Sequence, residues 1–215
     1  MLHTCKRSVL CGKSSRRKIA TKGSANNPVY VHFNRDLLII DTETTGLDPK
    51  IHRVLQLAGI LLDKNTLETR QFFTSYIYAG PKDFELASPK ALEINHITPE
   101  LVASAPRFPT AWSNLTKTFQ EFSYDLAGQK IDFDITMLRR MCSIYRQPWP
   151  FDRSIDLWSM FYSVAAIKNL PFSKRYAGLN AMKEHFSKIH TTHDALQDCE
   201  DVADILRQFV RIIGS

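Results

Sequence analysis

The amino-acid sequence predicts an α/β fold with a mixed central sheet. Three apolar or β-branched runs come first, within residues 37–77, and short turns separate them. Helix and strand patterns then alternate along the rest of the chain. Strands joined by tight turns pair antiparallel and strands joined through helices pair parallel, so one sheet would hold both kinds of pair. The 215 residues are enough to bury the core of such a domain.

The three early runs predict an antiparallel meander. Leu37–Ile40 is a run of four aliphatic residues without alternation, which is typical of a strand buried on both faces. Val54–Leu62 is a second apolar strand, and Asp63-Lys64-Asn65 after it has turn chemistry. Thr69–Ile77 is β-branched and aromatic, which favours a third strand.

The later elements follow from helical periodicity and from short apolar runs. Ser88 and Pro89 have the residue types of a helix cap and a first helical position. The predicted elements are, in order, a helix over Ser88–Asn95, a helix over Pro109–Phe122, a strand over Tyr124–Ala127 ended by Gly128, a helix over Phe133–Tyr145, a strand over Ser154–Leu157, a helix through Ile167, a helix over Ala177–Phe186, and a long amphipathic helix on which Ala195, Cys199, Val202, Leu206 and Phe209 share one face.

The basic charge of the chain is concentrated in residues 1–30. Seven of the 28 Lys and Arg residues fall there together with no Asp or Glu, so 21 basic residues face 22 acidic ones in residues 31–215. We therefore divide the chain into a basic segment, 1–30, and one domain, 31–215, of nearly neutral charge. The segment fits a solvated tail, an organellar import signal, or an arm that binds nucleic acid.

Four widely spaced cysteines without a CxxC pair argue against a disulfide framework or a structural zinc site. This usage predicts an intracellular, reducing compartment. The cytoplasm is favoured, and organellar import through residues 1–30 stays open. No apolar run approaches the roughly 18 residues that cross a bilayer, so no membrane association is expected.

Two carboxylates end the first strand. Asp41 and Glu43 lie two residues apart, and residues i and i+2 of a strand point to the same side. Two like charges in a partly buried place repel unless cations neutralise them. Asp134, at the start of a predicted helix, and Asp198, in the last helix, are candidates to complete a cage of oxygen ligands for Mg²⁺ or Mn²⁺.

These motifs in this order resemble the DEDDh (DnaQ-like) family of 3′→5′ exonucleases. The resemblance spans about residues 35–210 and rests on Asp41-Thr-Glu-Thr-Thr-Gly, on Phe133-Asp134, and on His193 with Asp198 five residues later. Ile94-Asn95-His96-Ile97-Thr98-Pro99 also resembles a family segment. The family includes proofreading subunits, ribonuclease T and oligoribonuclease, and it implies a ribonuclease H-like fold.

The resemblance implies a role for each matching residue. Asp41, Glu43, Asp134 and Asp198 would hold two divalent ions per site, Mg²⁺ or Mn²⁺, and His193 would be the general base. The backbone around Thr44 and Leu47 would bind the terminal nucleotide, and His96 and Lys130 are further candidates for substrate contact. The implied partner is the 3′ end of single-stranded DNA or RNA, with a DNA polymerase or a second copy of the chain as further candidates.

The spacing of His193 and Asp198 adds a local prediction. Five helical residues turn through about 140° net, so the two side chains would not share a helix face. We therefore expect His193 in the turn before the helix, with Thr191 or Thr192 near the cap. Asp194 and Asp201 are interpreted as solvent-facing residues or as residues that compensate the helix dipole.

The chain departs from the family pattern at Gln129-Lys130, where the family commonly has His-Asn. Lys130 could contact a substrate phosphate, or it could compete with a metal ion for Asp134. Retained activity is favoured because all five catalytic residue types are present. The alternatives are a catalytically weakened nucleic-acid- or polymerase-binding module on the same fold, and another ribonuclease H-like nuclease such as an endonuclease, which His193 disfavours.

Overall fold

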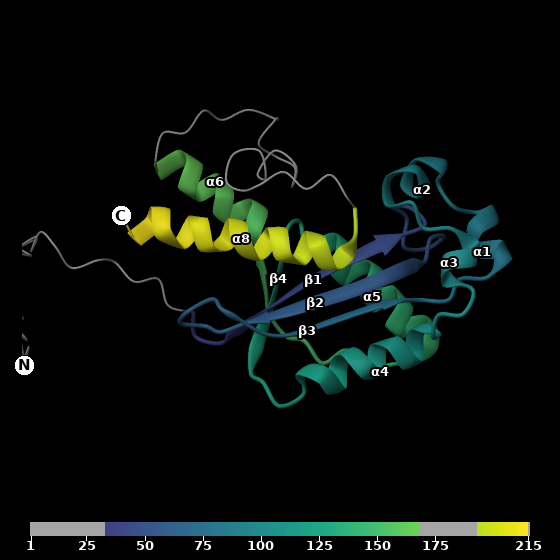
Figure 1. The fold of residues 1–215 in the computed structure, drawn as a ribbon, viewed down its shortest axis with the longest axis horizontal. Helices are drawn as coiled ribbons and strands as arrows, with labels where there is room; N and C mark the ends of the chain where they lie inside the picture. Colours follow the sequence, from purple (N-terminus) through teal and green to yellow (C-terminus); the bar gives the residue numbers. More distant parts are fainter. Residues whose placement is uncertain (1–32, 168–192, 215) are drawn as a thin grey trace, which may run out of the picture.

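The computed structural model describes residues 33–167 and 193–214 (Figure 1). These ranges hold a five-stranded sheet with helices on both faces. The basic segment 1–30 and the helix expected over Ala177–Phe186 lie outside the described residues. Those two expectations therefore stay predictions.

The sheet is mixed, as the sequence predicts. Its strand order is β3-β2-β1-β4-β5. The β1–β2 and β2–β3 pairs are antiparallel, and the β1–β4 and β4–β5 pairs are parallel. The strands are β1 Asp36–Thr44, β2 Val54–Leu62, β3 Thr69–Tyr76, β4 Tyr124–Gly128 and β5 Ser154–Asp156.

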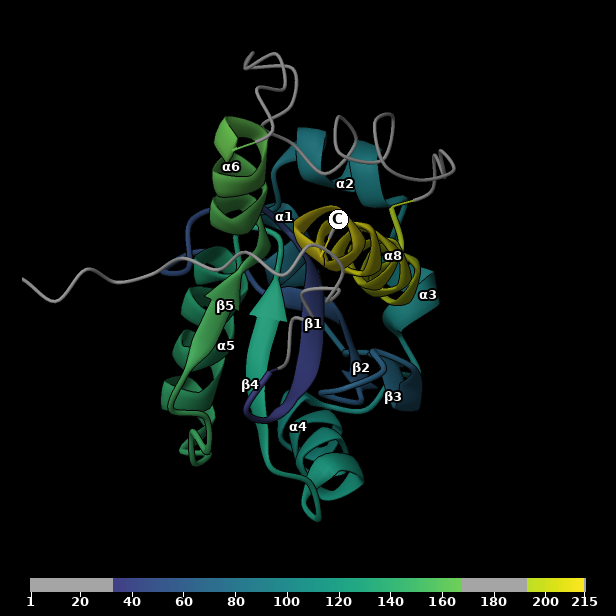
Figure 2. The ribbon, with the colours of Figure 1, turned by 90° about the vertical axis from the view of Figure 1, so that its left-hand side faces the viewer.

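The helices form two layers and an end group (Figure 2). α4 and α5 pack on one face of the sheet, α6 and α8 pack on the other, and α1 to α3 lie at one end. Among the described residues, none of these helices combines the length and the apolar character of a bilayer span. The helices are α1 Pro81–Glu85, α2 Pro89–Asn95, α3 Pro99–Val102, α4 Phe108–Phe119, α5 Asp132–Tyr145, α6 Leu157–Ile167 and α8 Ala195–Gly214.

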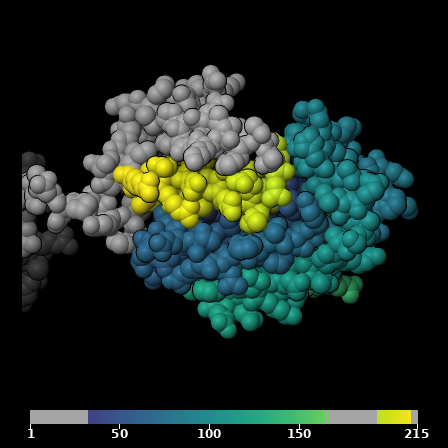
Figure 3. Space-filling model, viewed as in Figure 1, coloured from purple at the N-terminus to yellow at the C-terminus, as the bar shows by residue number. Residues whose placement is uncertain are grey.

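The central strand β1 separates two apolar cores. Leu37 and Ile39 pack with α6 and α8, whereas Leu38 and Ile40 pack with α4 and α5. The space-filling view shows α8 lying along the surface formed by the β2 and β3 region (Figure 3). Because side chains alternate along a strand, the acidic pair Asp41 and Glu43 continues the α8 side of the sheet.

Several element boundaries differ by a few residues from the sequence-based expectations, as the ends of α4 and β4 show. The α4 helix ends at Phe119, not at Phe122, because the chain turns there to enter β4, although Phe122 still packs against the core. The β4 strand is one residue longer than expected, and Gly128 is its last residue. A Cβ at Gly128 would lie 2.7 Å from Ile131 Cδ1 and 3.1 Å from the Ile40 carbonyl oxygen, so close approach to these neighbours explains the glycine.

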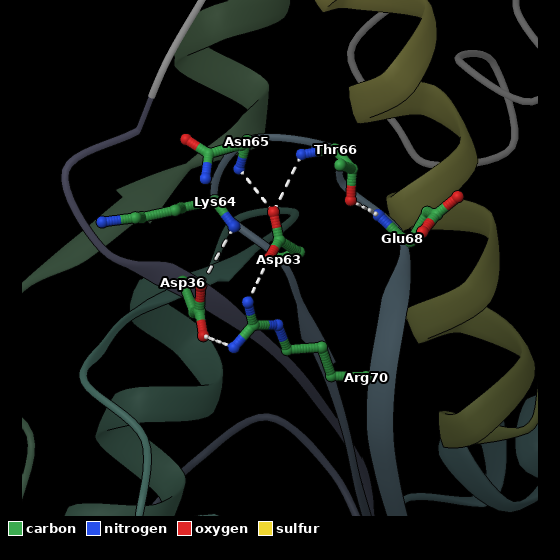
Figure 4. Close-up of polar contacts among 7 residues, drawn as sticks. All are labelled: Asp36, Asp63, Lys64, Asn65, Thr66, Glu68 and Arg70. Carbon is green, nitrogen blue, oxygen red and sulfur yellow. Dashed lines mark hydrogen bonds and ion pairs between the residues drawn. The ribbon is translucent and has the colours of Figure 1, made fainter.

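The end of the sheet away from α1–α3 is tied by a polar cluster in the β2–β3 turn (Figure 4). The Asp63 carboxylate accepts hydrogen bonds from the backbone N–H groups of Asn65 and Thr66 at 2.8 and 2.9 Å. Arg70 pairs with Asp63 and, at 3.1 Å, with Asp36 at the start of β1. The backbone hydrogen bonds and Arg70 together lower the pKa of Asp63 to about 2.

Candidate active site

The four candidate carboxylates come from three elements that meet at the C-terminal end of β1. Asp41 and Glu43 lie on β1, Asp134 lies in the first turn of α5, and Asp198 lies in the first turn of α8. Both helices begin at this point. The N-terminal end of a helix carries partial positive charge, so both helix starts favour the acidic groups placed there.

Glu43, His193 and Asp198 converge on one point. Their potential ligand atoms all lie within 4.8 Å of one another. His193 Nδ1 lies 4.0 Å from Asp198 Oδ2, with 37% of the histidine side chain exposed against 8% for the aspartate. His193 precedes α8, which begins at Ala195, as the spacing predicts. The histidine therefore reaches the carboxylates from the solvent side.

Asp134 is held from the other face of the sheet. Its carboxylate is buried, and Oδ1 accepts a hydrogen bond of 2.7 Å from the Thr42 hydroxyl. Thr42 lies between Asp41 and Glu43 on β1, and its side chain points to the α5 side. One short stretch of β1 thus supplies two acidic groups on one face and a donor on the other.

The electrostatics show that these groups form a single cluster. Burial, together with the charges of Asp198, Asp134 and Asp194, raises the pKa of Glu43 to about 7, against the lowering effect of a hydrogen bond from Asn95. Burial likewise raises the pKa of Asp134, against the Thr42 hydrogen bond and with a contribution from Asp198.

Asp41 belongs to the same cluster. The thiol of Cys199, one residue after Asp198, is buried, and burial raises its pKa well above the usual value. The charges of Asp41, Asp134 and Asp198 raise this pKa further, so all three act on one buried group. The four carboxylates predicted from the sequence are therefore neighbours.

The donor set fits a divalent cation. Several carboxylate oxygens converge in a place where burial and mutual repulsion disfavour their charges. Hard oxygen ligands of this kind suit Mg²⁺ and Mn²⁺, and a bound cation would favour the ionised forms. Among the described residues Glu43, His193 and Asp198 form a group with metal-site spacing, and Asp41 and Asp134 stand beside it.

Asn95 supports the site and was not singled out in the sequence. It ends α2, is 6% exposed, and hydrogen bonds to Glu43. Its amide also donates to the Thr44 carbonyl at 3.0 Å and accepts from the Ile97 N–H at 3.1 Å. The neighbouring His96, which was singled out, is exposed. The available signal was the resemblance of the segment 94–99, which contains Asn95, to a family segment.

Asp194 caps the helix that carries Asp198. Its Oδ1 accepts hydrogen bonds from the Leu196 and Gln197 N–H groups at 3.1 and 3.2 Å, which is N-cap geometry and compensates the helix dipole. The cap is therefore Asp194, while the expected Thr191 and Thr192 lie outside the described residues. The solvent-facing alternative for Asp201 is wrong, because Asp201 is 3% exposed.

The four candidate substrate residues lie in different environments. Thr44 is buried, and its hydroxyl donates to the Gly46 carbonyl at 2.9 Å inside the β1–β2 turn. Leu47 in the following loop is 78% exposed, and His96 and Lys130 are also exposed. Leu47, His96 and Lys130 are therefore accessible to a ligand, whereas the Thr44 side chain shapes the turn.

Lys130 has a fixed backbone in the β4–α5 connection. Its φ of 54° is left-handed, and its N–H donates to Asp156 Oδ1 at 2.8 Å. The other carboxylate oxygen of Asp156 accepts from Ser159 N and Oγ at 3.1 and 2.8 Å in the first turn of α6. Asp156 thus caps α6, and it also orders the loop that leads to Asp134.

The fold and the site define a class of protein. A mixed sheet whose central strand ends in paired carboxylates, completed by acidic residues at two helix starts and a histidine, is the arrangement of a nuclease with a ribonuclease H-like fold. Comparison with known proteins identifies the family to which the chain belongs.

Residues 38–206 match the RNase_T family model, described as Exonuclease. DNA polymerase III subunit epsilon of Treponema pallidum is 24% identical over 134 residues, which are 62% of this chain and 59% of that protein. The nuclease domain of 3′hExo, a DEDDh family member solved with rAMP, has a TM-score of 0.67 at 21% identity and covers 83% of this chain and 92% of its own. Escherichia coli exonuclease I, solved with a dT13 oligonucleotide, has a TM-score of 0.70 at 19% identity over 80% and 40% of the two chains.

The chain belongs to this exonuclease family, of the DEDDh (DnaQ-like) type. The aligned region spans about three fifths of the Treponema pallidum relative.

Proposed function

We propose that the protein is a divalent-metal-dependent 3′→5′ exonuclease that removes nucleotides from the 3′ ends of single-stranded DNA or RNA. The observation that carries the proposal is the convergence of Glu43, His193 and Asp198 within 4.8 Å, beside Asp41 and the buried Asp134. Enzymes of the DEDDh family depend on divalent metal ions, and the acidic cluster fits such ions.

The residues of the cluster would have different roles in phosphodiester hydrolysis. Asp41, Glu43, Asp134 and Asp198 would hold two ions, Mg²⁺ or Mn²⁺. When bound, two such ions supply an activated water and neutralise charge on the phosphate and the leaving oxygen. His193 would take the proton from the attacking water, since an imidazole with an unperturbed pKa of about 6.5 suits a base near neutral pH. Its partial exposure leaves room for that water.

Substrate contacts would come from the accessible residues around this cluster. We assign the 3′-terminal nucleotide to the Thr44–Leu47 backbone and the exposed Leu47, with His96 and Lys130 near the phosphates. Because residues 31–215 carry almost no net charge, local contacts of this kind would dominate over a broad basic surface.

One assay tests the proposal. A 5′-labelled single-stranded DNA and the matching RNA are incubated with Mg²⁺, Mn²⁺ or a chelator. We expect a ladder that shortens from the 3′ end, depends on metal, and slows by about 10²–10⁴-fold in Asp41→Ala and His193→Ala. Asp152→Ala, at an exposed position in the β5 approach, is the control. Cleavage that survives chelation, or binding without cleavage, would contradict the proposal.

The departure at Gln129-Lys130 makes a catalytically weakened binding module the second candidate. If Lys130 competes for Asp134, then Lys130→Asn should lower the Mg²⁺ concentration needed for half-maximal rate. If Lys130 contacts a substrate phosphate, the same variant should raise KM. We favour the second outcome, because the Lys130 side chain is exposed while Asp134 is buried against Thr42.

Residues 1–30 are proposed as a separate basic segment. If they form an arm on nucleic acid, their removal should reduce the salt dependence of binding. Seven contacts to a single strand would change the slope of log K against log salt by at most about 5. An unchanged slope would point to an import signal or an idle tail.

A DNA polymerase and a second copy of the chain are proposed partners, to be tested by analytical ultracentrifugation.

A further inference from the structure

A buried glutamine joins the sheet to the start of α8. Gln56 on β2 is 4% exposed and lies opposite Glu43 in the β1–β2 register. Its amide nitrogen donates to Asp194 Oδ2 at 2.7 Å, and its amide oxygen accepts from the Ala195 N–H at 3.3 Å. Both polar atoms of the Gln56 amide therefore bind the start of α8. The nitrogen binds the cap, Asp194, and the oxygen binds the first helical residue, Ala195.

The connection continues into the helix through Asp194. Asp194 Oδ2 accepts the hydrogen bond from Gln56, while Oδ1 accepts hydrogen bonds from the N–H groups of Leu196 and Gln197. The two oxygens of one carboxylate thus link β2 to the helix backbone. His193 is the residue before this cap and Asp198 is four residues after it, so the link lies between two of the groups that converge with Glu43.

We propose that Gln56 is a positioning residue, which fixes His193 and Asp198 relative to Glu43 by locking the start of α8 to β2. The inference rests on the proposed function, because it assigns Gln56 to the same reaction. Gln56 acts through Asp194 and does not touch the reacting atoms. Buried hydrogen-bond partners of this kind set the orientation of the groups that they hold.

The direction of the hydrogen bond from Gln56 to Asp194 can be tested by exchanging the donor and the acceptor. Gln56→Glu would place a second carboxylate 2.7 Å from Asp194, where two acceptors would face each other. Asp194→Asn would face an amide N–H₂ towards the Gln56 N–H₂. Turning the Gln56 amide over would only move the clash to the Ala195 N–H. Each single substitution therefore leaves a mismatched buried pair.

The double variant Gln56→Glu/Asp194→Asn rebuilds the link in reverse. The introduced amide at position 194 can donate to the introduced carboxylate at position 56, which can still accept from the Ala195 N–H. The amide oxygen at position 194 can still cap Leu196 and Gln197. The double variant also keeps the net charge of the wild type, so a general electrostatic effect on metal binding cancels.

The experiment measures kcat, KM and Mn²⁺ affinity for the wild type, both single variants and the double variant. Thermal unfolding by circular dichroism shows that each protein is folded at the assay temperature. Gln56→Met, which keeps most of the volume and removes both hydrogen bonds, serves if a charged single variant does not fold. Gln71→Glu, at an exposed position of the edge strand β3, is the matched control.

We expect each single variant, and Gln56→Met, to lose about 10- to 100-fold in kcat with KM changed by less than about twofold. Mn²⁺ affinity should fall about 10-fold in the single variants, and the double variant should recover both quantities. Folded single variants with wild-type kcat, or a double variant as impaired as the sum of the singles, would overturn the inference.

The Mn²⁺ measurement separates the two levels of the proposal. If the wild type cleaves no nucleic acid, the proposed function fails. The loss of Mn²⁺ affinity in the single variants and its recovery in the double variant would still show that the link positions Asp198. If the wild type cleaves and the variants follow neither pattern, only the role of Gln56 fails.

Discussion

In the absence of bound cations, the ionised Glu43 carboxylate should lower the free energy of unfolding. Burial, with neighbouring carboxylates, raises its pKa from 4.5 to about 7. A carboxyl with a raised pKa in the folded protein binds its proton more tightly there than in the unfolded chain. The cost of ionising it is therefore absent below pH 4.5 and complete above pH 7. At 1.36 kcal/mol per pH unit, the shift corresponds to about 3 kcal/mol at pH 8.

The perturbation is Glu43→Gln, which removes the charge and keeps the shape. In chelator at pH 8 the variant should be more stable than the wild type by up to about 3 kcal/mol, which is about 6–12 °C in Tm for a domain of this size. The difference should vanish near pH 4.5. Saturating Mg²⁺ should stabilise the wild type more than the variant, because the variant lacks one ligand.

Thermal and urea unfolding from pH 4.5 to 8, with and without Mg²⁺, provide the measurement. Glu121→Gln, at an exposed position after α4, is the matched control and should leave the pH dependence of unfolding unchanged. If the wild type and Glu43→Gln have parallel stability curves over this range, then Glu43 does not carry a buried charge and the reasoning is refuted.

Three further predictions concern the surroundings of the site. Because the pKa of Asp63 is lowered to about 2, its stabilisation is present above pH 3.8 and lost as the pH falls through about 2, so Asp63→Asn should flatten the acid limb of an unfolding curve. Gly46→Ala would place a Cβ 2.5 Å from the His52 ring at a φ of 154°, and should raise KM and lower Tm in parallel assays. Asp156→Ala should cost about 1 kcal/mol in urea unfolding through the lost α6 cap, and should also raise KM because Asp156 holds the backbone of Lys130.

The strands and the shared side of Asp41 and Glu43 could be predicted because their signals are local, whereas the roles of Asp134 and Asp198 came from the family resemblance. Val54–Leu62 is an unbroken apolar run with a turn after it, and β2 has these bounds. The placement of Asp41 and Glu43 follows from the alternation of a strand, and that of His193 follows from the helical period. In each case a few consecutive residues determine the geometry, so sequence spacing is enough.

The supporting residues could not be predicted because their roles depend on pairs far apart in the sequence. Gln56 meets Asp194 only because β2 lies beside β1 in a given register and α8 crosses that face. Asn95 reaches Glu43 from a short helix at the end of the sheet. A lone Gln or Asn in an apolar context gives no indication of which distant residue it contacts.

Contacts between residues far apart in the sequence also matter at Lys130, where the chain departs from the family pattern. The backbone there is fixed by Asp156, and Asp134 is fixed by Thr42, so neither depends on the side chain at position 130. A side chain that is exposed and does not shape the loop can change the local charge while the carboxylate geometry is kept. Added positive charge beside a site for a polyanion favours phosphate binding. The substitution is therefore more consistent with altered substrate affinity than with a dismantled metal site.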